Sequence, residues 1–155
     1  MTAVTLDLSA YRSAVTSHAQ SLGLFGQVLD YEPVSAPGSG LTLALWVARI
    51  SPIPARSGLA SVSARLELSG RILMPVDTEP KGDIDLQVVA AVDGLLREYA
   101  GDFELGGLVA AVDLLGMHGA ALAAQFGYTR FDSTTYRVAT LTVPLIINDA
   151  WTEAP

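Results

Sequence analysis

The residues best suited to chemistry are Asp113 and His118, an acid followed five positions later by one of the two histidines of the chain. A bend in the apolar stretch 114–117 between them could bring the carboxylate to the imidazole, as a general base requires. No serine stands in a nucleophile-elbow pattern, and no spacing of paired metal ligands occurs. We therefore interpret both residues as structural and expect no enzymatic activity. A small-molecule-binding or hydrolytic domain using Asp113 and His118 remains an alternative.

The other polar residues that could do chemistry are better explained by structure. His18 lies on or beside the apolar stripe of the first expected helix, and nothing near it in sequence could share a metal ion. Asp83 with Asp85, and Asp102 with Glu104, are expected to be helix caps or solvated carboxylates. The absence of cysteine excludes disulfides, thiolate zinc sites and a thiol nucleophile. We expect neither a cofactor nor a metal.

Length and composition limit the function further. With 155 residues, the chain is expected to form a single domain spanning 1–155. Half of the residues are hydrophobic and only 16% are charged, which predicts that part of the apolar surface contacts partners. A net charge of -7 with a single lysine argues against sequence-specific binding of nucleic acid, but an acidic wall lets DNA slide past. No apolar run is long enough for a membrane span, so a soluble protein is expected.

The first third predicts a helix followed by strands. A cap at Asp7 or Ser9 begins the helix and Gly23 ends it. A short strand over 25–31 and a longer one over 41–50 follow. The longer strand carries apolar residues on both faces, so we expect it to be central or covered by a partner.

Residues 51–58, SPIPARSG, predict a projecting loop of defined shape, because Pro52 and Pro54 stiffen the chain around Arg56. Two interpretations stay open, a contact with a partner and a solvated hairpin loop. The return strand over 61–69 alternates apolar and polar residues, which indicates one buried and one wet face.

The centre of the chain predicts a second helix from a cap at Asp83 to about Tyr99. Asp93 and Arg97 form an i, i+4 pair on its outer side. Gly94 in mid-helix favours a close approach of this helix to a sheet. On the return strand before this helix, Arg65 and Glu67 are expected on the solvated face, and a polar sheet face that lines a lumen is the alternative.

The last third, 108–149, predicts antiparallel strands joined by a turn at 131–134. The final strand alternates with period two. Pro144 cannot donate to a ladder, which favours an edge, a bulge or the end of the strand, and an edge is where another copy could dock. A short C-terminal tail is expected over about 150–155, where Trp151 is either an interface anchor or part of a frayed end.

Together these elements predict an α+β fold, an antiparallel or mixed β-sheet with two main helices packed on one face. The opposite face and the edges of such a sheet need cover from elsewhere. Association with other chains would supply that cover.

A set of short motifs spread over the last third carries a resemblance to a known family. In chain order they are Val112-Asp113-Leu114-Leu115-Gly116, Gly119, Gly127-Tyr128, Tyr136-Arg137-Val138 with Thr140, and Pro144-Leu145-Ile146-Ile147-Asn148-Asp149. This pattern resembles the C-terminal half of tail terminator proteins of long-tailed siphovirus phages that infect actinobacteria, and the order of the other elements fits that family too. The motif residues expected to be structural are Asp113, Gly116, Gly127, Tyr128, Arg137, Pro144 and Asp149.

The resemblance implies a virion structural protein that needs no active site. Proteins of this family form a homohexameric ring that caps the major tail tube protein, ends tail polymerisation and offers its other face to the head-tail connector or neck protein. DNA passes through the lumen of the ring. The implied location is the head-proximal end of the tail in the virion, after assembly in the host cytoplasm, with no membrane partner.

Two further points follow from this resemblance. A head-completion or adaptor protein at the head-tail junction is the alternative within the virion. The residues expected at interfaces are Pro52, Pro54, Arg56, Pro144 and Trp151.

Overall fold

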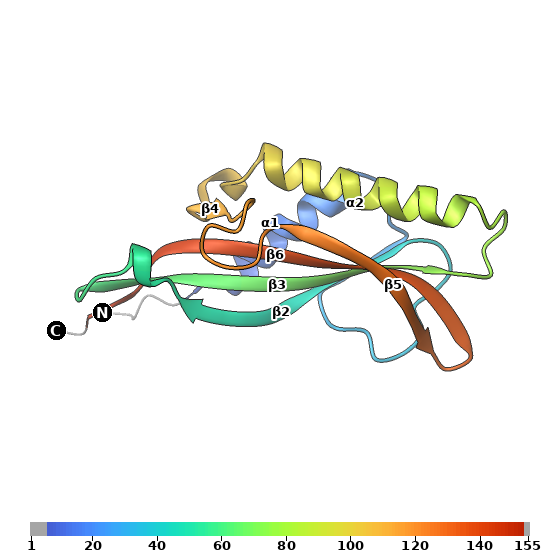
Figure 1. Ribbon diagram of the computed structural model, residues 1–155, viewed down its shortest axis with the longest axis horizontal. Coiled ribbons are helices and arrows are strands. Elements are labelled where there is room, and N and C mark those ends of the chain that lie inside the picture. Colours follow the sequence, from blue (N-terminus) through green and yellow to red (C-terminus); the bar gives the residue numbers. More distant parts are fainter. Residues whose placement is uncertain (1–5, 154–155) are drawn as a thin grey trace.

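In the computed structural model, which describes residues 6–153, a long twisted sheet carries both helices on one side (Figure 1). The strands are ordered β1 (Gln27–Leu29), β2 (Thr42–Pro52), β3 (Ser61–Pro75), β6 (Thr134–Thr152) and β4 (Ala111–Val112), and β5 (Ala123–Phe131) also pairs with β6. Only the β1–β2 pair is parallel. The predicted α+β architecture is confirmed.

The first helix begins and ends where the sequence predicts. In α1 (Leu8–Ser21) the Asp7 side chain accepts a hydrogen bond of 3.2 Å from the backbone N–H of Ala10. Gly23 follows with a φ of 67°, the left-handed conformation that ends many helices. Asp7 is therefore the cap, and Ser9 lies inside the helix.

The second helix, α2 (Asp83–Gly101), begins at Asp83, whereas a cap at Asp83 would place its first residue at position 84. Gly82 occupies the cap position without a side-chain hydrogen bond, and Asp83 is the first helical residue, so its prediction as the cap was wrong. A carboxylate in the first turn still opposes the positive end of the helix dipole. The predicted outer pair is confirmed, with Arg97 and Asp93 2.8 Å apart.

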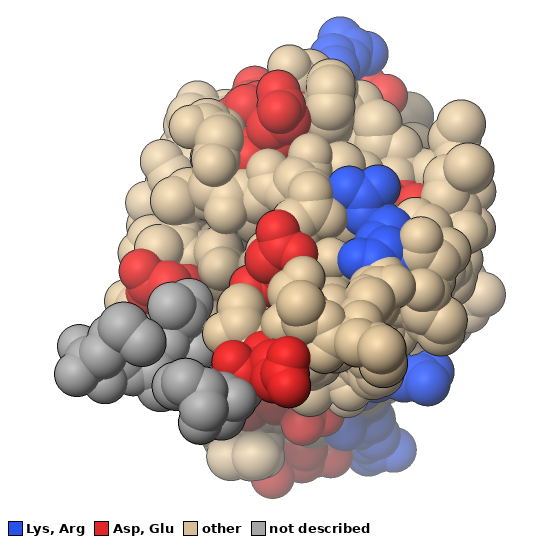
Figure 2. All heavy atoms as spheres, turned by 90° about the vertical axis from the view of Figure 1, so that its left-hand side faces the viewer, with Lys and Arg blue, Asp and Glu red and all other residues tan. Residues whose placement is uncertain are grey.

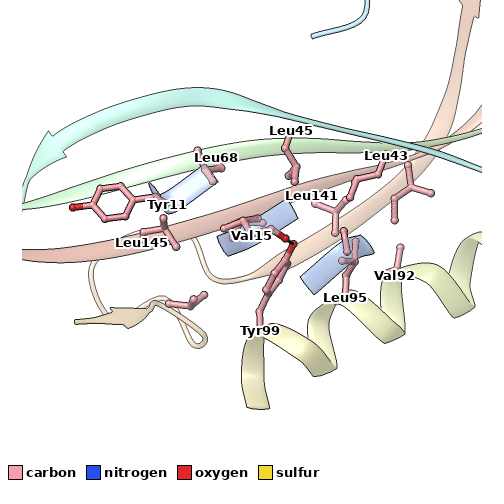
Figure 3. Packing of buried hydrophobic residues seen from close by; sticks show 14 of the residues in the cluster. Tyr11, Val15, Leu43, Leu45, Leu68, Val92, Leu95, Tyr99, Leu141 and Leu145 are labelled. Atoms are coloured by element: carbon pink, nitrogen blue, oxygen red, sulfur yellow. Dashed lines mark hydrogen bonds between the residues drawn. The ribbon is translucent and has the colours of Figure 1, made fainter. Parts of the chain in front are cut away.

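The core fills the space between the helices and one face of the sheet. Figure 3 shows Val15 of α1 and Leu95 and Tyr99 of α2 pointing toward the leucines of the strands. The hydroxyl of Tyr99 donates to the Val15 carbonyl oxygen at 3.0 Å, which ties the two helices together. Burial raises the pKa of the Tyr99 hydroxyl, so it stays a donor at any ordinary pH.

Gly94 marks a close approach, but not the predicted one. A Cβ atom there would lie 3.2 Å from the Leu22 side chain, just after α1, rather than against the sheet. The missing side chain thus lets the two helices approach each other.

The long final strand β6 confirms its predicted alternation but not its predicted place. Ala139, Leu141, Val143, Leu145 and Ile147 are all buried. The strand is internal, with β3 on one side and β4 and β5 on the other, so the expectation of an edge at its proline was wrong.

Pro144 escapes the usual cost of a central proline because of a gap between strands. On that side of β6, pairing with β5 ends at Thr142 and pairing with β4 begins at Leu145. The Pro144 carbonyl oxygen accepts a 2.8 Å hydrogen bond from the backbone N–H of Asp113, so its nitrogen also points into this gap. The proline therefore costs the sheet no hydrogen bond between strands. The Pro144 side chain is buried.

Two other segments complete the chain. The β2–β3 connection contains the 3₁₀ turn η1 (Pro54–Arg56), and η2 (Leu105–Gly107) follows α2. The predicted C-terminal tail was placed too early, since β6 continues to Thr152, and residues 154–155 lie outside the described part. No helix among the described residues combines the length and apolarity that crossing a membrane requires.

Candidate functional site

The carboxylate of Asp113 organises the loop between β4 and β5. It accepts the backbone N–H of Met117 at 2.7 Å and that of His118 at 3.0 Å. Asp113 itself is 3% exposed. The structure thus brings the two predicted residues together through the backbone of His118, not through its imidazole.

This arrangement explains why the two residues do not form an acid-base pair. Both carboxylate oxygens of Asp113 accept hydrogen bonds from backbone amides, and no hydrogen bond joins the half-buried His118 imidazole to Asp113. A general base needs its orienting carboxylate on the ring nitrogen. The geometry supports the structural interpretation of Asp113 and His118.

Arg65 lies under the same loop, where the sequence predicted a solvated side chain. It is only 4% exposed, so that prediction was wrong. Its guanidinium donates to the carboxylate of Glu67 and to the carbonyl oxygen of Ala120, while Nε lies 3.7 Å from Oδ2 of Asp113. The strand pattern was correct, but the loop that covers this face comes from a distant part of the chain.

Two glycines let the loop fold down onto Arg65. Gly116 has a φ of 73°, and a Cβ atom there would lie 2.7 Å from the backbone oxygen of Gly119. A Cβ atom on Gly119 would lie 2.7 Å from the guanidinium of Arg65. The family-motif residue Gly116 is therefore required by the local backbone.

Arg137 forms a second cluster at the other end of the sheet. Its Nε lies 2.9 Å from the carboxylate of Asp85 on α2, and Nη1 donates to the Gly127 carbonyl oxygen at 3.2 Å. The guanidinium stacks over Tyr128 at 4.7 Å and lies 5.8 Å from the Phe126 ring. The motif residues Arg137, Gly127 and Tyr128 thus meet, and they join the β5–β6 hairpin to the start of α2.

Gly127 has no such steric explanation. A Cβ atom there would meet only a Val138 methyl at 3.9 Å, an ordinary contact. Nothing among residues 6–153 explains why a glycine should stand at this position.

The projecting loop is fastened to an irregular stretch of β6. Arg56 donates to the Asn148 side-chain oxygen through both Nε and Nη2, at 3.0 and 2.9 Å. Asp149 adopts a φ of 52°, and its carboxylate accepts the Ser61 hydroxyl at 2.6 Å. The motif residue Asp149 therefore shapes the bulge that holds this end of the hairpin.

The predicted interface residues divide into two groups. Pro52, Pro54 and Arg56 are exposed on the loop, and Trp151 is 38% exposed on β6 beside it, whereas Pro144 is buried. Figure 2 views the molecule from this end, and most of the surface there is uncharged. The end of the molecule is accessible to a partner, but the buried proline is not.

His18 connects α1 to the end of α2. Its Nδ1 lies 2.8 Å from Glu98 and its Nε2 lies 2.9 Å from Asp102. The carboxylates flank opposite edges of the ring and cannot share one ion, and residues 6–153 contain no cluster of metal-binding side chains. The backbone N–H of Gly106 and then His18 lower the pKa of Asp102.

Within residues 6–153, the sheet face opposite the helices is covered only at its two ends. At one end Tyr136 donates its hydroxyl to Pro37 in the connection before β2, at 2.6 Å, and at the other the Asp113 loop covers Arg65. Between them the side chains remain at least partly exposed and mostly polar. They are Trp46, Arg49, Glu67, Ser69, Arg71, Gln125, Thr140 and Thr142.

Two features of these sites were missed by the sequence interpretation. The Arg65 cluster gave no local signal, because its partners lie far along the chain. Arg137 did give one, since it is a charged residue in the inward register of an otherwise apolar strand.

Comparison with known proteins adds no assignment. No family model matches the chain, and no curated protein matches it.

Proposed function

We propose that the protein is a tail terminator of a long-tailed phage, a ring-forming virion protein that caps the tail tube and passes DNA through its lumen. The observation that carries this proposal is the open polar face of the sheet. Its centre has no cover among residues 6–153, although helices bury the other face. A ring of copies would turn such a face toward a shared passage.

The charge of that face suits a passage for DNA. Arg71 stacks over the Trp46 ring at 5.4 Å, Arg49 lies in register with Glu67, and Glu67 pairs with Arg65, so the cations of the described face are few and each lies beside an aromatic ring or a carboxylate. Tight phosphate binding needs several free cations, each displacing counterions. With a net charge of -7 for the whole chain, DNA would move past without being held.

The motif residues support the proposal in a different way. Asp113 and Gly116 form the loop that covers one end of the face, and Tyr128 and Arg137 fasten the hairpin at the other end. The residues that carry the family resemblance therefore act together to shape the sheet.

The test is to measure the mass of the purified protein by light scattering over a range of concentrations, with electron micrographs of the same sample and of a mixture with tail tubes. We expect rings of six, or a monomer that forms rings at tube ends and stops further tube growth. Binding to filled capsids without capping tubes would instead support an adaptor at the head-tail junction. A monomer that decorates neither structure would contradict both.

A further inference from the structure

Each side of the sheet ends in strand backbone that has no partner in the described chain. β1 pairs with β2 only through Thr42, Leu43 and Ala44, so residues 46–52 of β2 border no other strand on that side. At the far side, β5 pairs with β6 along its length and with no further strand. Unpaired edges of this kind are templates for another strand.

The hydrogen bonds of β6 show which residues of β5 face outward. Pro144 and Ile146 accept bonds from the β4 side, so the even-numbered residues of β6 direct their backbone groups toward β4 and β5. Their partners on β5 are the odd-numbered residues. Phe126 and Tyr128 therefore direct their N–H and C=O groups away from the sheet.

The same reasoning applies to β2. Leu41 accepts a hydrogen bond from the β1 side, so odd-numbered residues up to Val47 face outward. An irregularity follows Val47, and beyond it Ile53 donates to β3, which leaves Ile50 facing outward. Pro52 also faces outward, where its missing N–H removes no bond to β3.

The outward-facing residues of both edges carry their side chains on the same face of the sheet. Val47 and Ile50 are in register with core leucines of β3, and Phe126 is in register with a core alanine of β6. All are therefore on the helix-bearing face, yet beyond the cover of the helices. Their exposed fractions are 40% for Val47, 46% for Ile50, 44% for Phe126 and 68% for Tyr128.

The strand directions make these two edges complementary. β2 and β6 run one way and β3 and β5 run the other, so a copy rotated about an axis in a ring presents its β2 antiparallel to the β5 of its neighbour. Residues directly opposite in an antiparallel pair project to the same face. The exposed apolar side chains would then meet, with the helices of both copies on one side.

We propose that residues 46–52 of one copy pair with β5, residues 123–131, of the next, which makes the sheet continuous around the ring. The inference rests on the ring of the proposed function. The contact is head-to-tail, so each copy uses its β2 edge toward one neighbour and its β5 edge toward the other. Such contacts form a closed ring when the rotations between successive copies add up to a full turn. The polar face of every copy then lines one continuous inner wall.

The register of this contact requires tilted strands. Gly127, the middle of β5, lies level with Thr42 across the sheet, whereas Arg49, the middle of the free β2 edge, is about six paired positions further along. At about 3.3 Å per residue, neighbouring copies are displaced by roughly 20 Å along their strands. A closed sheet accommodates such a displacement by tilting its strands relative to the axis.

The natural absence of cysteine makes disulfide trapping a direct test. Two double variants place one thiol on each edge and test two neighbouring registers of the contact. One combines Ile50→Cys with Phe126→Cys, and the other combines Ile50→Cys with Tyr128→Cys. Mild oxidation of the assembled protein should give a ladder of covalent oligomers that ends at the number of copies in the ring. Leu86→Cys with Phe126→Cys is the matched control, since Leu86 lies exposed on α2, and it should give no ladder.

Edge substitutions give a second measurement. Ile50→Lys and Phe126→Lys should each weaken association at least tenfold, because a charge would be buried at the joint. Leu86→Lys also replaces an exposed apolar residue by lysine and should leave association unchanged. Circular dichroism of the monomer distinguishes lost association from lost folding.

The outcomes separate this inference from the proposed function. Rings that form without any covalent ladder would overturn the edge pairing and leave the terminator proposal intact. A ladder from rings that never cap tubes would support the edge pairing and contradict the terminator proposal. No assembly at any concentration, alone or on tubes, would contradict both.

Discussion

Arg65 and Asp113 face each other in the protein interior, with Nε 3.7 Å from Oδ2 and neither side chain more than 4% exposed. That separation makes an ion pair without a hydrogen bond, and the Arg65 Nε has no hydrogen-bond partner among the described residues. The amides of the loop satisfy the carboxylate instead. The buried ion pair and the loop over residues 113–120 therefore stabilise each other.

Replacing Asp113 by alanine is expected to cost about 3–5 kcal/mol of the free energy of unfolding, because a buried guanidinium loses one of its two carboxylate partners and two loop N–H groups lose their acceptor. Asp113→Asn should cost less, since the amide oxygen still accepts one loop N–H. Urea unfolding measures both. The control is His118→Ala, which should change stability by no more than about 0.5 kcal/mol, because only its backbone is bonded. A larger loss for His118→Ala than for Asp113→Ala would contradict the structural assignment.

Gly116→Ala should destabilise the protein by about 1–3 kcal/mol. Alanine is strained at a positive φ, and its Cβ would lie 2.7 Å from a backbone oxygen. Gly38→Ala is the matched control, because a Cβ there meets nothing within 4 Å and the φ is not positive. The thermal midpoints of the two variants should differ by several degrees. Equal midpoints would show that the loop relaxes around the added methyl.

Acid should weaken the connection between α2 and η2 through Asp102. Its folded-state pKa is lowered, first by the Gly106 N–H and then by His18, so its contribution is complete above the unfolded value of about 3.9. That contribution is lost as pH falls through the lowered folded value. Asp102→Asn should therefore flatten the decline of stability below about pH 4, more than His18→Asn does. Thermal midpoints measured from pH 2 to pH 6 test this order, and the reverse order would assign the main effect to His18.

Arg137→Ala should cost about 1–2 kcal/mol, because the guanidinium loses its stack on Tyr128 and its bond to Asp85. Asp85 is largely exposed, so the ion pair contributes the smaller part. Arg130→Ala on the same hairpin is the control and should be nearly neutral, since its one hydrogen bond is exposed. Denaturant midpoints at constant m-value make the comparison. Similar losses for both arginines would mean that the aromatic stack adds nothing.

Local patterns predicted most of the elements, because their causes are local. The Asp7 cap, the glycine after α1 and the alternation of β6 all depend on neighbours within a few residues. The layer arrangement followed from the same patterns, since two amphipathic helices and one half-apolar sheet have few ways to bury their surfaces.

The errors at Arg65, Pro144 and Gly94 share one physical cause, which is contact between distant segments. The local pattern predicts Arg65 as a surface residue, but the loop near Asp113 covers it. The local pattern also predicts Pro144 at an edge, but it lies in an internal strand, beside the gap between β4 and β5. The sequence predicts that Gly94 approaches the sheet, but the neighbouring side chain is that of Leu22, just after α1. Periodicity within one element contains no information about these placements.

The paired length of β3 and β6 gives the molecule a direction of mechanical strength. The two strands pair from Ser61 to Pro75, with one irregularity after Val62, and run nearly the whole length of the molecule (Figure 1). A pull along that axis must slide one strand past the other and break their hydrogen bonds together, as in shear. A sideways pull on β5 would instead open its bonds to β6 one after another. The protein should thus resist tension along its strands far better than peeling across them.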